Sequence, residues 1–437
     1  MANNLLKEYV LLRHRDIENI HNIEVYLAHG GYDGLKKAMK GMTAEEVTNE
    51  VKASGLRGRG GAGFPAGVKW GFIPKNIFPK YVVVNADESE PGTFKDREIM
   101  ESNPHQFIEG VILCAYAVGA ETAYIYGRGE FMTLFNQGLQ KAIDDAYAKG
   151  FLGKNILDSN FSLEIYLHLG AGAYICGEET ALLSSLEGLL GQPRSRPPFP
   201  AVEGLYAKPT VINNVETLAN VPPIIANGAN WYRQYGTEKS PGTKIFSLSG
   251  RVNKPGNYEL PLGTPIRYLI EECGGGIIDG KAVKGILPAG ASSAIVGPDK
   301  LDTPMDYEAM AAAGTMLGSA SFIILDETVD AVWAAEKNVK FFKHESCGKC
   351  SPCREGTHWL VSVYEKLREG RGTKNDVQIL NTIIEQMEGN CFCLLGEFVV
   401  PGVRTSLNLF GAEYEALAVN EESETKQPQK NLVHMYL

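Results

Sequence analysis

The chain has 437 residues, which at roughly 150 residues per domain allows two to four domains. Hydrophobic residues make up 44% of it and charged residues 22%, values that exclude collagenous, coiled-coil and largely disordered chains. With 42 basic and 52 acidic residues the net charge is −10, the wrong sign for a protein that neutralises nucleic-acid phosphates over a broad face.

Nothing in the sequence predicts a signal peptide or a membrane span. Charged residues interrupt the first 20 positions, so the apolar core of a signal peptide is missing there. The longest apolar run lies at Val111–Ala120. Its length of about 10 residues is half of the ~20 that a membrane helix needs. We therefore expect this chain to meet a membrane only through a partner.

Residues 1–240 alternate between helical and strand patterns. Thr43 and Glu46 have the spacing of a capping box, and the helix that they open is expected to end at Gly55. Tyr81–Asn85 is a β-branched apolar run typical of a buried strand. Such alternation predicts an α/β layer architecture. Further on we expect a helix at 104–118, a strand at 123–126, a helix at 131–148 and a strand at 161–169.

The predicted secondary structure changes twice after residue 240. Short β-rich pieces separated by Pro and Gly turns predict a second, small domain over 241–327, with strands at Lys244–Ser249, Gly285–Leu287 and Ser321–Leu325. From 328 to 419, apolar residues recur at helical spacing and predict a helical bundle. Residues 420–437 are polar and are expected to form a flexible tail.

Five of the eight cysteines cluster near the C-terminus. Cys347, Cys350 and Cys353 form a C-x2-C-x2-C triple, and Cys391 and Cys393 offer a fourth ligand. Structural zinc usually gathers paired ligands from two arms, whereas a triple plus one remote cysteine is typical of an iron–sulfur cluster. We favour the cluster over zinc. The isolated Cys114, Cys176 and Cys273 are expected to be core residues.

A glycine-rich loop at 58–63 satisfies G-x-G-x-x-G, the dinucleotide-binding pattern. That motif requires a preceding strand, and here a helix precedes it, so its usual interpretation fails. Small residues would still let backbone N–H groups approach a phosphate. Arg59 and Lys69 are expected to add positive charge beside the loop.

Two further segments combine glycines with carboxylates: a polar turn at 85–92 directly after the buried strand, and residues 170–180. Arg196, Phe199 and the carboxamides of Asn213 and Asn214 add an aromatic ring and hydrogen-bonding groups. Together they indicate one composite pocket for a planar, phosphate-bearing ligand such as a flavin or nicotinamide nucleotide. No arrangement of a nucleophile with its base is present, which disfavours hydrolysis.

Five long segments carry a resemblance to a known family. Over residues 25–415 the chain resembles the NADH-binding, flavin-carrying F subunit of bacterial respiratory NADH:quinone oxidoreductase, complex I. The segments are Leu56–Pro65, Asn85–Thr93, Gly170–Glu179, Asn213–Thr217 and Glu345–Gly356.

The resemblance implies a fold and two sites. It implies a Rossmann-like FMN- and NADH-binding α/β domain, a β-grasp-like domain, and a helical bundle that carries one [4Fe–4S] cluster. Adenine would lie among Phe64, Phe72 and Phe199. Glu90 and Glu179 would lie near the nicotinamide and the ribose. The FMN-binding set is Gly58, Arg59, Gly60, Gly61, Lys69, Asn85, Asp87, Glu88, Tyr174, Gly177, Glu178, Asn213 and Asn214. The NADH-binding set is Phe64, Phe72, Glu90, Glu179, Arg196 and Phe199, and the cluster ligands are Cys347, Cys350, Cys353 and Cys393.

The implied activity is hydride transfer from NADH to FMN, followed by single-electron transfer to the cluster. No catalytic residue is expected for the hydride step, because the hydride passes between NADH and FMN. The implied partners are a thioredoxin-like [2Fe–2S] subunit and a large iron–sulfur subunit, in a peripheral arm on the cytoplasmic face of the cell membrane. Two alternatives stay open: a diaphorase subunit of a soluble NAD-linked hydrogenase or formate dehydrogenase, and a zinc-stabilised scaffold without enzymatic activity.

The sequence departs from the family at two positions. Arg196 stands where the family commonly has Lys, which keeps the charge but alters the geometry of a phosphate contact. Cys391 is an additional thiol two residues before the expected ligand Cys393, and it remains the alternative ligand.

Overall fold

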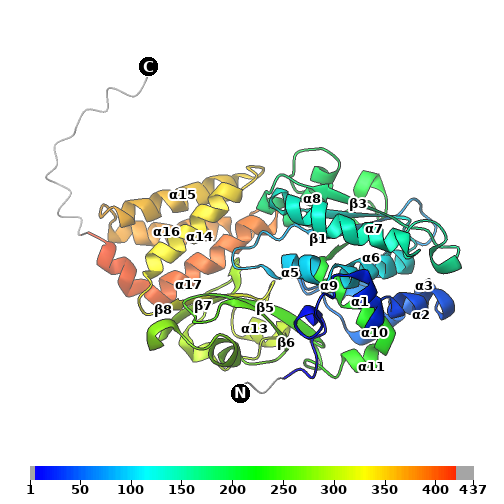
Figure 1. The fold of residues 1–437 in the computed structure, drawn as a ribbon. Coiled ribbons are helices and arrows are strands. Elements are labelled where there is room, and N and C mark those ends of the chain that lie inside the picture. Colours follow the sequence, from blue (N-terminus) through cyan, green and yellow to red (C-terminus); the bar gives the residue numbers. More distant parts are fainter. Residues whose placement is uncertain (1–4, 420–437) are drawn as a thin grey trace. The chain divides into compact units, whose positions relative to one another are not determined.

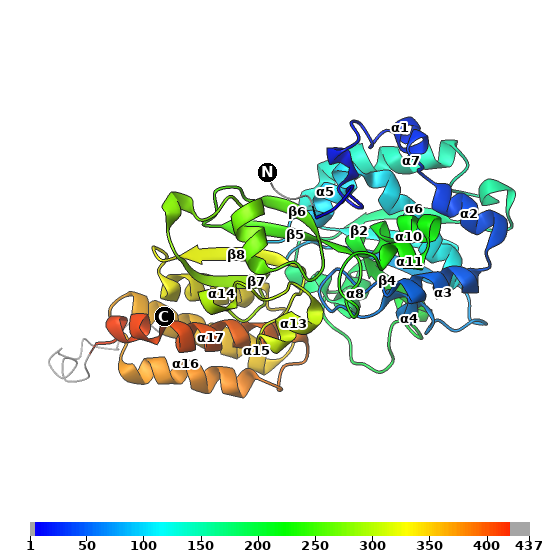
Figure 2. The same ribbon diagram turned by 90° about the horizontal axis from the view of Figure 1, so that it is seen from below.

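The computed structural model describes residues 5–419, and the chain divides after Thr328 into two compact units. Figures 1 and 2 show two β-sheets with their helices in the first unit and a group of helices in the second. The tail expected at 420–437 lies outside the described residues.

The first sheet consists of four parallel strands in the order β3-β2-β1-β4. In its interior β1 pairs with both neighbours, so that Val84 lies opposite Ile125 on one side and Asn213 on the other. Val82 and Val83 are fully buried, as expected for a strand covered on both faces. The predicted α/β architecture is confirmed. The strands are β1 Tyr81–Ala86, β2 Thr122–Gly127, β3 Glu164–Leu169 and β4 Thr210–Asn214.

The helices around this sheet begin and end where local signals place them. Thr43 and Glu46 form the predicted capping box, and the helix stops at Gly55 in the left-handed conformation. The helix predicted at 104–118 has those bounds and packs against β1 and β2. The helices are α1 Ile23–Ala28, α2 Asp33–Gly41, α3 Ala44–Ser54, α4 Ala66–Trp70, α5 Lys95–Ser102, α6 Pro104–Val118, α7 Gln140–Ala148, α8 Glu179–Leu186, α9 Val215–Ala219, α10 Val221–Asn227 and α11 Ala229–Tyr232.

Three details differ from the sequence-based expectations. The helix predicted at 131–148 contains a π-helical segment, Leu134–Leu139, immediately before α7. The strand expected from residue 161 starts only at Glu164. The sequence pattern did not predict β4, because it is a five-residue strand directly after a proline and its strand signal is short.

The second sheet is mixed, with the order β6-β5-β8-β7. β5 and β8 run parallel at its centre, and the outer pairs are antiparallel. Phe246, Leu248, Phe322 and Ile324 are buried in its own core. Three of the strands were predicted, and β6 was missed. The elements are β5 Thr243–Gly250, β6 Gly256–Pro261, β7 Val283–Ala291, β8 Ser321–Asp326, α12 Ile266–Tyr268 and α13 Tyr307–Ala312.

The second unit is the predicted helical bundle. Leu360, Tyr364 and Leu367 form one buried stripe, and Leu380, Ile384 and Met387 form another. Thr373 and Asp376 make a second capping box at the start of α16. The helices, which pack against one another, are α14 Ala331–Glu345, α15 Ser351–Arg368, α16 Lys374–Met387 and α17 Leu394–Leu417.

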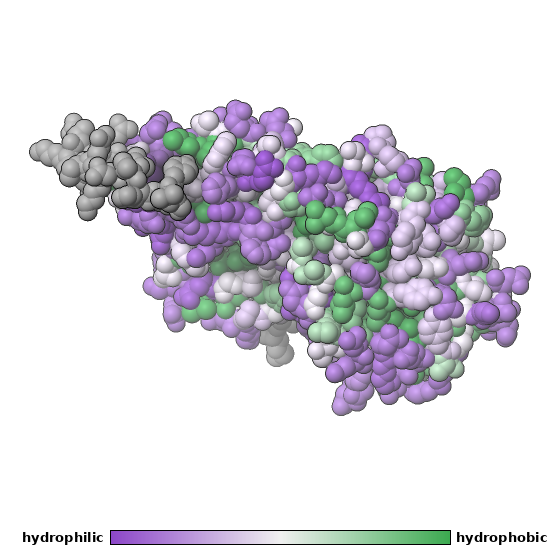
Figure 3. Space-filling view, turned by 90° about the horizontal axis from the view of Figure 1, so that it is seen from above, coloured by the Kyte–Doolittle hydropathy of each residue, from purple (hydrophilic) through white to green (hydrophobic). Residues whose placement is uncertain are grey.

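Within residues 5–419 no helix combines the length and the apolar character that crossing a bilayer requires. On the face drawn in Figure 3, apolar residues form patches between polar ones.

Candidate functional site

The glycine loop at 58–63 connects α3 to α4 and is closed by a hydrogen bond from Gly58 N to Phe64 O at 2.8 Å. Gly63 has a φ of +63°, and a Cβ there would come within 2.5 Å of the Tyr307 ring. Gly61 has a φ of +148°, with no atom within 4 Å of where its Cβ would be. The loop therefore packs tightly on one side and leaves the backbone open on the other, as the approach of a phosphate requires.

Arg59 points away from this open side. Its guanidinium donates hydrogen bonds to the Tyr232 hydroxyl at 2.9 Å and to the carbonyls of Pro241 and Thr243 at 3.0 Å each. The side chain is fully buried. The expectation that its charge lies beside the loop is therefore wrong, because these three acceptors hold the guanidinium in the interior. Lys69 is half-buried.

Asn85 joins the polar turn after β1 to the third glycine-rich segment. Its side-chain amide donates to the Gly177 carbonyl at 2.8 Å, and its amide oxygen accepts from Asp87 N at 3.1 Å. A Cβ at Gly177 would lie 3.4 Å from the Asp87 carboxylate. Residues that are 92 positions apart in sequence thus meet at the carboxyl end of β1, where parallel sheets place their ligands.

Glu88 and Glu178 each cap a helix. Glu88 accepts hydrogen bonds from the backbone N–H groups of Asp96 at 2.6 Å and Arg97 at 3.3 Å, in the first turn of α5. Burial raises the pKa of Glu88. Glu178 is the N-cap of α8 and accepts from Thr180 N and Ala181 N, both at 2.9 Å. These carboxylates therefore fix the segments that surround the site.

Charged side chains from three distant segments meet at the start of α8. Glu179 forms ion pairs with Lys69 at 3.3 Å and with Arg196 at 2.9 Å. Arg196 also lies 3.7 Å from Glu178. The predicted Lys69, Glu179 and Arg196 are thus brought together, and all three remain partly accessible to a ligand.

The three predicted phenylalanines, Phe64, Phe72 and Phe199, are between 47% and 57% exposed. Phe64 and Phe72 lie next to each other, with ring centroids 6.1 Å apart and planes tilted by 47°. Exposed aromatic rings beside charged groups are typical of a site that binds a planar ligand.

Asn213 and Asn214 end β4 and face two different neighbours. Asn214 is the N-cap of α9. A Cβ added at Gly60 would lie 2.9 Å from the Cβ of Asn214. It therefore lies directly against the glycine loop. The buried amide of Asn213 points to the sulfur of Cys114 at 3.7 Å.

Glu90 and Tyr174 are in direct contact: the Tyr174 hydroxyl donates to Glu90 Oε2 at 2.7 Å. Both side chains are half-buried. The structure thus brings together the polar turn, the glycine loop and residues 174–179, as the composite-pocket hypothesis requires.

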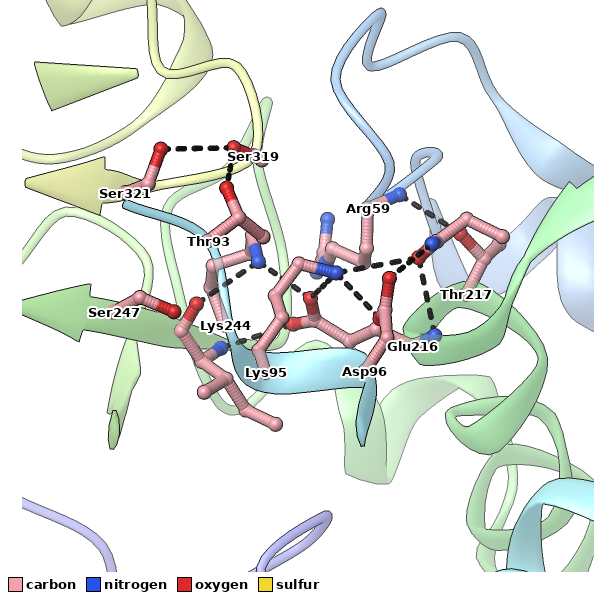
Figure 4. Close-up of polar contacts among 12 residues, drawn as sticks. Arg59, Thr93, Lys95, Asp96, Glu216, Thr217, Lys244, Ser247, Ser319 and Ser321 are labelled. Carbon is pink, nitrogen blue, oxygen red and sulfur yellow. Dashed lines mark hydrogen bonds and ion pairs between the residues drawn. The ribbon is translucent and has the colours of Figure 1, made fainter. Parts of the chain in front are cut away.

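A buried charge cluster that the sequence did not predict lies at this end of the sheet; we define it as Lys95, Asp96, Glu216 and Lys244 (Figure 4). Glu216 Oε2 lies 2.5 Å from Lys244 Nζ and 2.9 Å from Lys95 Nζ, and Lys95 also pairs with Asp96 at 2.7 Å. Burial lowers the pKa of Lys244 to about 7 against the opposing attraction of Glu216. Charged residues inside the apolar runs of α9 and β5 were the signal that could have revealed it.

The cysteines of the second unit come from two arms. Cys347 and Cys350 precede α15, Cys353 lies in its first turn, and Cys393 is the N-cap of α17. The arms are joined by Phe392 N, which donates to Cys350 Sγ at 3.5 Å. These four cysteines fit an iron–sulfur cluster with four thiolate ligands. Hydrogen bonds from backbone N–H groups to sulfur are typical of such sites. Within residues 5–419 no three His, Cys, Asp or Glu side chains lie close enough to share a single metal ion.

Cys391 occupies a different environment from Cys393. Its thiol donates to the Met387 carbonyl at 3.4 Å, and a Cβ at Gly396 would lie 2.4 Å from its sulfur. Burial raises its pKa. The Cys391 thiol is thus turned to a carbonyl of α16, whereas Cys393 is the N-cap of α17.

Family models match three parts of the chain. The Nuo51 FMN-binding domain matches residues 51–223, the SLBB domain residues 245–287, and the NADH-ubiquinone oxidoreductase-F iron-sulfur binding region residues 333–417. The second NADH-quinone oxidoreductase F subunit of Rhizobium meliloti (strain 1021) is 51% identical over 410 residues, covering 94% of this chain and 97% of the relative. The chain belongs to the family of NADH-quinone oxidoreductase F subunits. The F subunit of Streptomyces coelicolor (strain ATCC BAA-471 / A3(2) / M145) is 50% identical, covering 92% and 89% of the two chains.

A solved structure of an NAD+-reducing [NiFe]-hydrogenase in the H2-reduced state is similar, with a TM-score of 0.79 and 36% sequence identity. The match covers 86% of this chain but only 63% of the hydrogenase chain. This chain thus spans less than two thirds of the length of that relative.

These matches decide among the alternatives that the sequence left open. The FMN-binding and iron–sulfur models, together with F-subunit relatives over almost the whole chain, make this protein an oxidoreductase. Its cofactors are FMN and a [4Fe–4S] cluster. The zinc-scaffold hypothesis is therefore wrong.

Proposed function

We propose that this chain oxidises NADH and passes the electrons on singly, as the electron-input subunit of a respiratory NADH:quinone oxidoreductase. When bound, FMN accepts a hydride from NADH and releases its two electrons one at a time to the [4Fe–4S] cluster. The observation that carries the proposal is the convergence of three distant segments beside β1, within the part of the chain that matches the FMN-binding model.

We assign the flavin phosphate to the open side of the glycine loop. Gly60 and Gly61 bring the backbone to it, while Gly58 closes the loop through its hydrogen bond to Phe64 O. Lys69 supplies the positive charge that Arg59 does not. Asn85, Asp87 and the segment from Tyr174 to Glu178 would border the ring system. Asn213 and Asn214 shape the wall behind it, since Asn214 packs against Gly60.

We assign the adenine of NADH to Phe64, Phe72 and Phe199, whose exposed rings offer stacking surfaces. Glu179 and Arg196 would bind the ribose and phosphate groups. They pair with each other, which keeps both charges in place. Glu90 would border the nicotinamide, and no protein acid or base is needed for the hydride step.

We assign the cluster to Cys347, Cys350, Cys353 and Cys393. The partners in this proposal are other subunits of the complex: a thioredoxin-like [2Fe–2S] subunit and a large iron–sulfur subunit. The complex would present this chain in a peripheral arm on the cytoplasmic face of the cell membrane. The naming of the relatives as F subunits supports this assembly.

A second assembly is favoured by one observation. The similarity to the NAD+-reducing hydrogenase, at 36% identity, is compatible with a diaphorase subunit of a soluble enzyme. The F-subunit relatives are more similar, at 50–51% identity, and the matches cover a larger share of both chains. We therefore place the chain in the respiratory complex.

The test is anaerobic absorption and low-temperature EPR of the purified chain with FMN supplied, before and after addition of NADH. We expect bleaching of the flavin band together with one reduced-cluster signal. A colourless sample that contains zinc and shows no change with NADH would contradict the proposal.

A further inference from the structure

A loop of the second sheet reaches the polar turn that carries Glu90. The loop follows β7 and contains Ser292, whose side chain is 4% exposed. Ser292 Oγ donates to Glu90 Oε2 at 2.7 Å, and Ser292 N donates to Glu90 Oε1 at 2.9 Å. Both oxygens of one carboxylate are thus bound by a residue 202 positions away in the sequence.

Tyr174 completes this arrangement. Its hydroxyl donates to Glu90 Oε2 and lies 3.0 Å from Ser292 Oγ, so the three side chains form a closed triangle. Glu90 and Tyr174 belong to the two segments that border the composite pocket, whereas Ser292 belongs to the other sheet. The orientation of Glu90 therefore depends on a residue outside the FMN-binding fold.

The backbone on both sides is shaped for this contact. Gly290 has a φ of +67°, and a Cβ there would come within 2.3 Å of the Pro91 carbonyl. Gly92 has a φ of +90°, and a Cβ there would lie 2.9 Å from Ile323. Such close approach is available only to glycine. It shows that the turn packs closely against the end of β7 and against β8.

A chain of hydroxyl groups extends the contact. Thr93 Oγ1 lies 2.8 Å from Ser319 Oγ, which lies 3.0 Å from Ser321 Oγ at the start of β8 (Figure 4). The C-terminal part of the turn, from Glu90 to Thr93, is thus bound by the second sheet.

We propose that Ser292 is a positioning residue for NADH oxidation: it holds the Glu90 carboxylate, together with Tyr174, in the orientation that receives the nicotinamide. The second sheet with its loop thereby becomes part of the NADH site. This inference rests on the proposed function, since it takes Glu90 to border the nicotinamide.

The test is stopped-flow bleaching of the FMN-loaded full chain by NADH under anaerobic conditions, in wild type, Ser292→Ala, Glu90→Gln and the double variant. Ser292→Ala removes the hydroxyl but leaves the backbone N–H bond to Glu90. We expect the limiting bleaching rate to fall about 10-fold, because misoriented groups slow the reaction even when ligand is bound. The NADH concentration for half-maximal rate should change less than about 3-fold, since the adenine contacts are untouched.

The double-mutant cycle separates positioning from a general structural role. If Ser292 acts through Glu90, Ser292→Ala should cause no further slowing in the Glu90→Gln background. An equal loss in both backgrounds would overturn the inference, as would a Ser292→Ala protein with wild-type kinetics. Ser292→Thr keeps the hydroxyl and should restore the rate to within about 3-fold of wild type, so a variant as slow as Ser292→Ala would also count against the inference.

Ser249→Ala is the matched control. Ser249 is a half-buried serine of β5 whose hydroxyl donates a long hydrogen bond of 3.5 Å to the Phe322 carbonyl, and the variant should bleach like wild type. Failure of the proposed function gives a different result, because the wild-type chain itself would then not bleach with NADH.

Discussion

At the scale of single residues, Glu109 on α6 is a carboxyl group enclosed by the fold. Its oxygens accept hydrogen bonds from the Tyr26 hydroxyl at 2.6 Å, Tyr32 N at 2.9 Å and Leu35 N at 3.0 Å. Burial nevertheless raises its pKa from 4.5 to about 7. The hydrogen bonds favour the charged form, but the loss of water outweighs them.

This shift makes the stability of the fold depend on pH. Between pH 4.5 and about 7 the folded chain holds a proton on Glu109 that the unfolded chain has released. Stability should therefore fall as the pH rises through this window, by on the order of 3 kcal/mol in total. Glu109→Gln removes the titrating group. We expect the difference in melting temperature, variant minus wild type, to increase by several degrees from pH 5 to pH 8. Each kcal/mol shifts the melting temperature of a chain of this size by about 2–4 °C.

Thermal unfolding of both proteins at several pH values measures this difference. Only the change in the difference with pH is predicted, because the substitution also alters the hydrogen bonds. A constant difference from pH 5 to pH 8 would show that Glu109 does not carry a raised pKa.

At the scale of elements, the buried charge cluster joins α5, α9 and β5. Glu216 on α9 lies between Lys95 of α5 and Lys244 of β5, and all three side chains are almost completely buried. Ile245 N also donates to Glu216 Oε1 at 2.9 Å. Glu216 thus pairs with Lys244 and shares Lys95 with Asp96, and it ties the first strand of the second sheet to the helices of the first.

Glu216→Gln should therefore be strongly destabilising. It leaves the buried Lys244 without its counter-charge and leaves Lys95 with Asp96 alone. Removal of one partner of a buried pair typically costs about 3–5 kcal/mol. Urea unfolding followed by tryptophan fluorescence measures the change. Asp302→Asn is the control, because Asp302 pairs with Arg267 where solvent reaches both side chains. That substitution should cost much less, because exposed ion pairs contribute little to stability. Equal effects would show that the cluster contributes no more than a surface ion pair.

At the scale of the whole molecule, the two cofactor regions lie in different compact units. The FMN-binding match ends at residue 223, within the unit that ends at Thr328, and the iron–sulfur match begins at residue 333 in the other. Each unit has its own set of packed elements. Loss of the cluster should therefore leave flavin binding and reduction intact.

Cys393→Ser and Cys391→Ser test this independence and the choice of ligand together. We expect Cys393→Ser to lose the cluster EPR signal and onward electron transfer while NADH still bleaches its flavin. Cys391→Ser should keep both signals, because the Cys391 thiol is turned to the Met387 carbonyl. The opposite pattern would make Cys391 the ligand, and loss of bleaching in Cys393→Ser would contradict the independence of the two units.

Local signals account for the parts of the fold that the sequence predicted. A capping box needs only Thr43 and Glu46, and the end of a helix needs only Gly55, so these features are confirmed at the expected positions. β4 and β6 were not predicted, because strands of five and six residues carry little periodic signal and are stabilised by their neighbours in the sheet.

The sequence by itself determined the layer architecture, the cysteine centre and the three segments that make up the candidate pocket, because these depend on patterns within a few residues. Only the tertiary structure decided the direction of individual side chains. Arg59 turns inward to Tyr232, Glu88 caps a helix, and Ser292 holds Glu90. For Arg59 and Glu90 the partner is more than 150 positions away. Packing, and the need to satisfy every buried charge, selects such partners, and no local pattern records them.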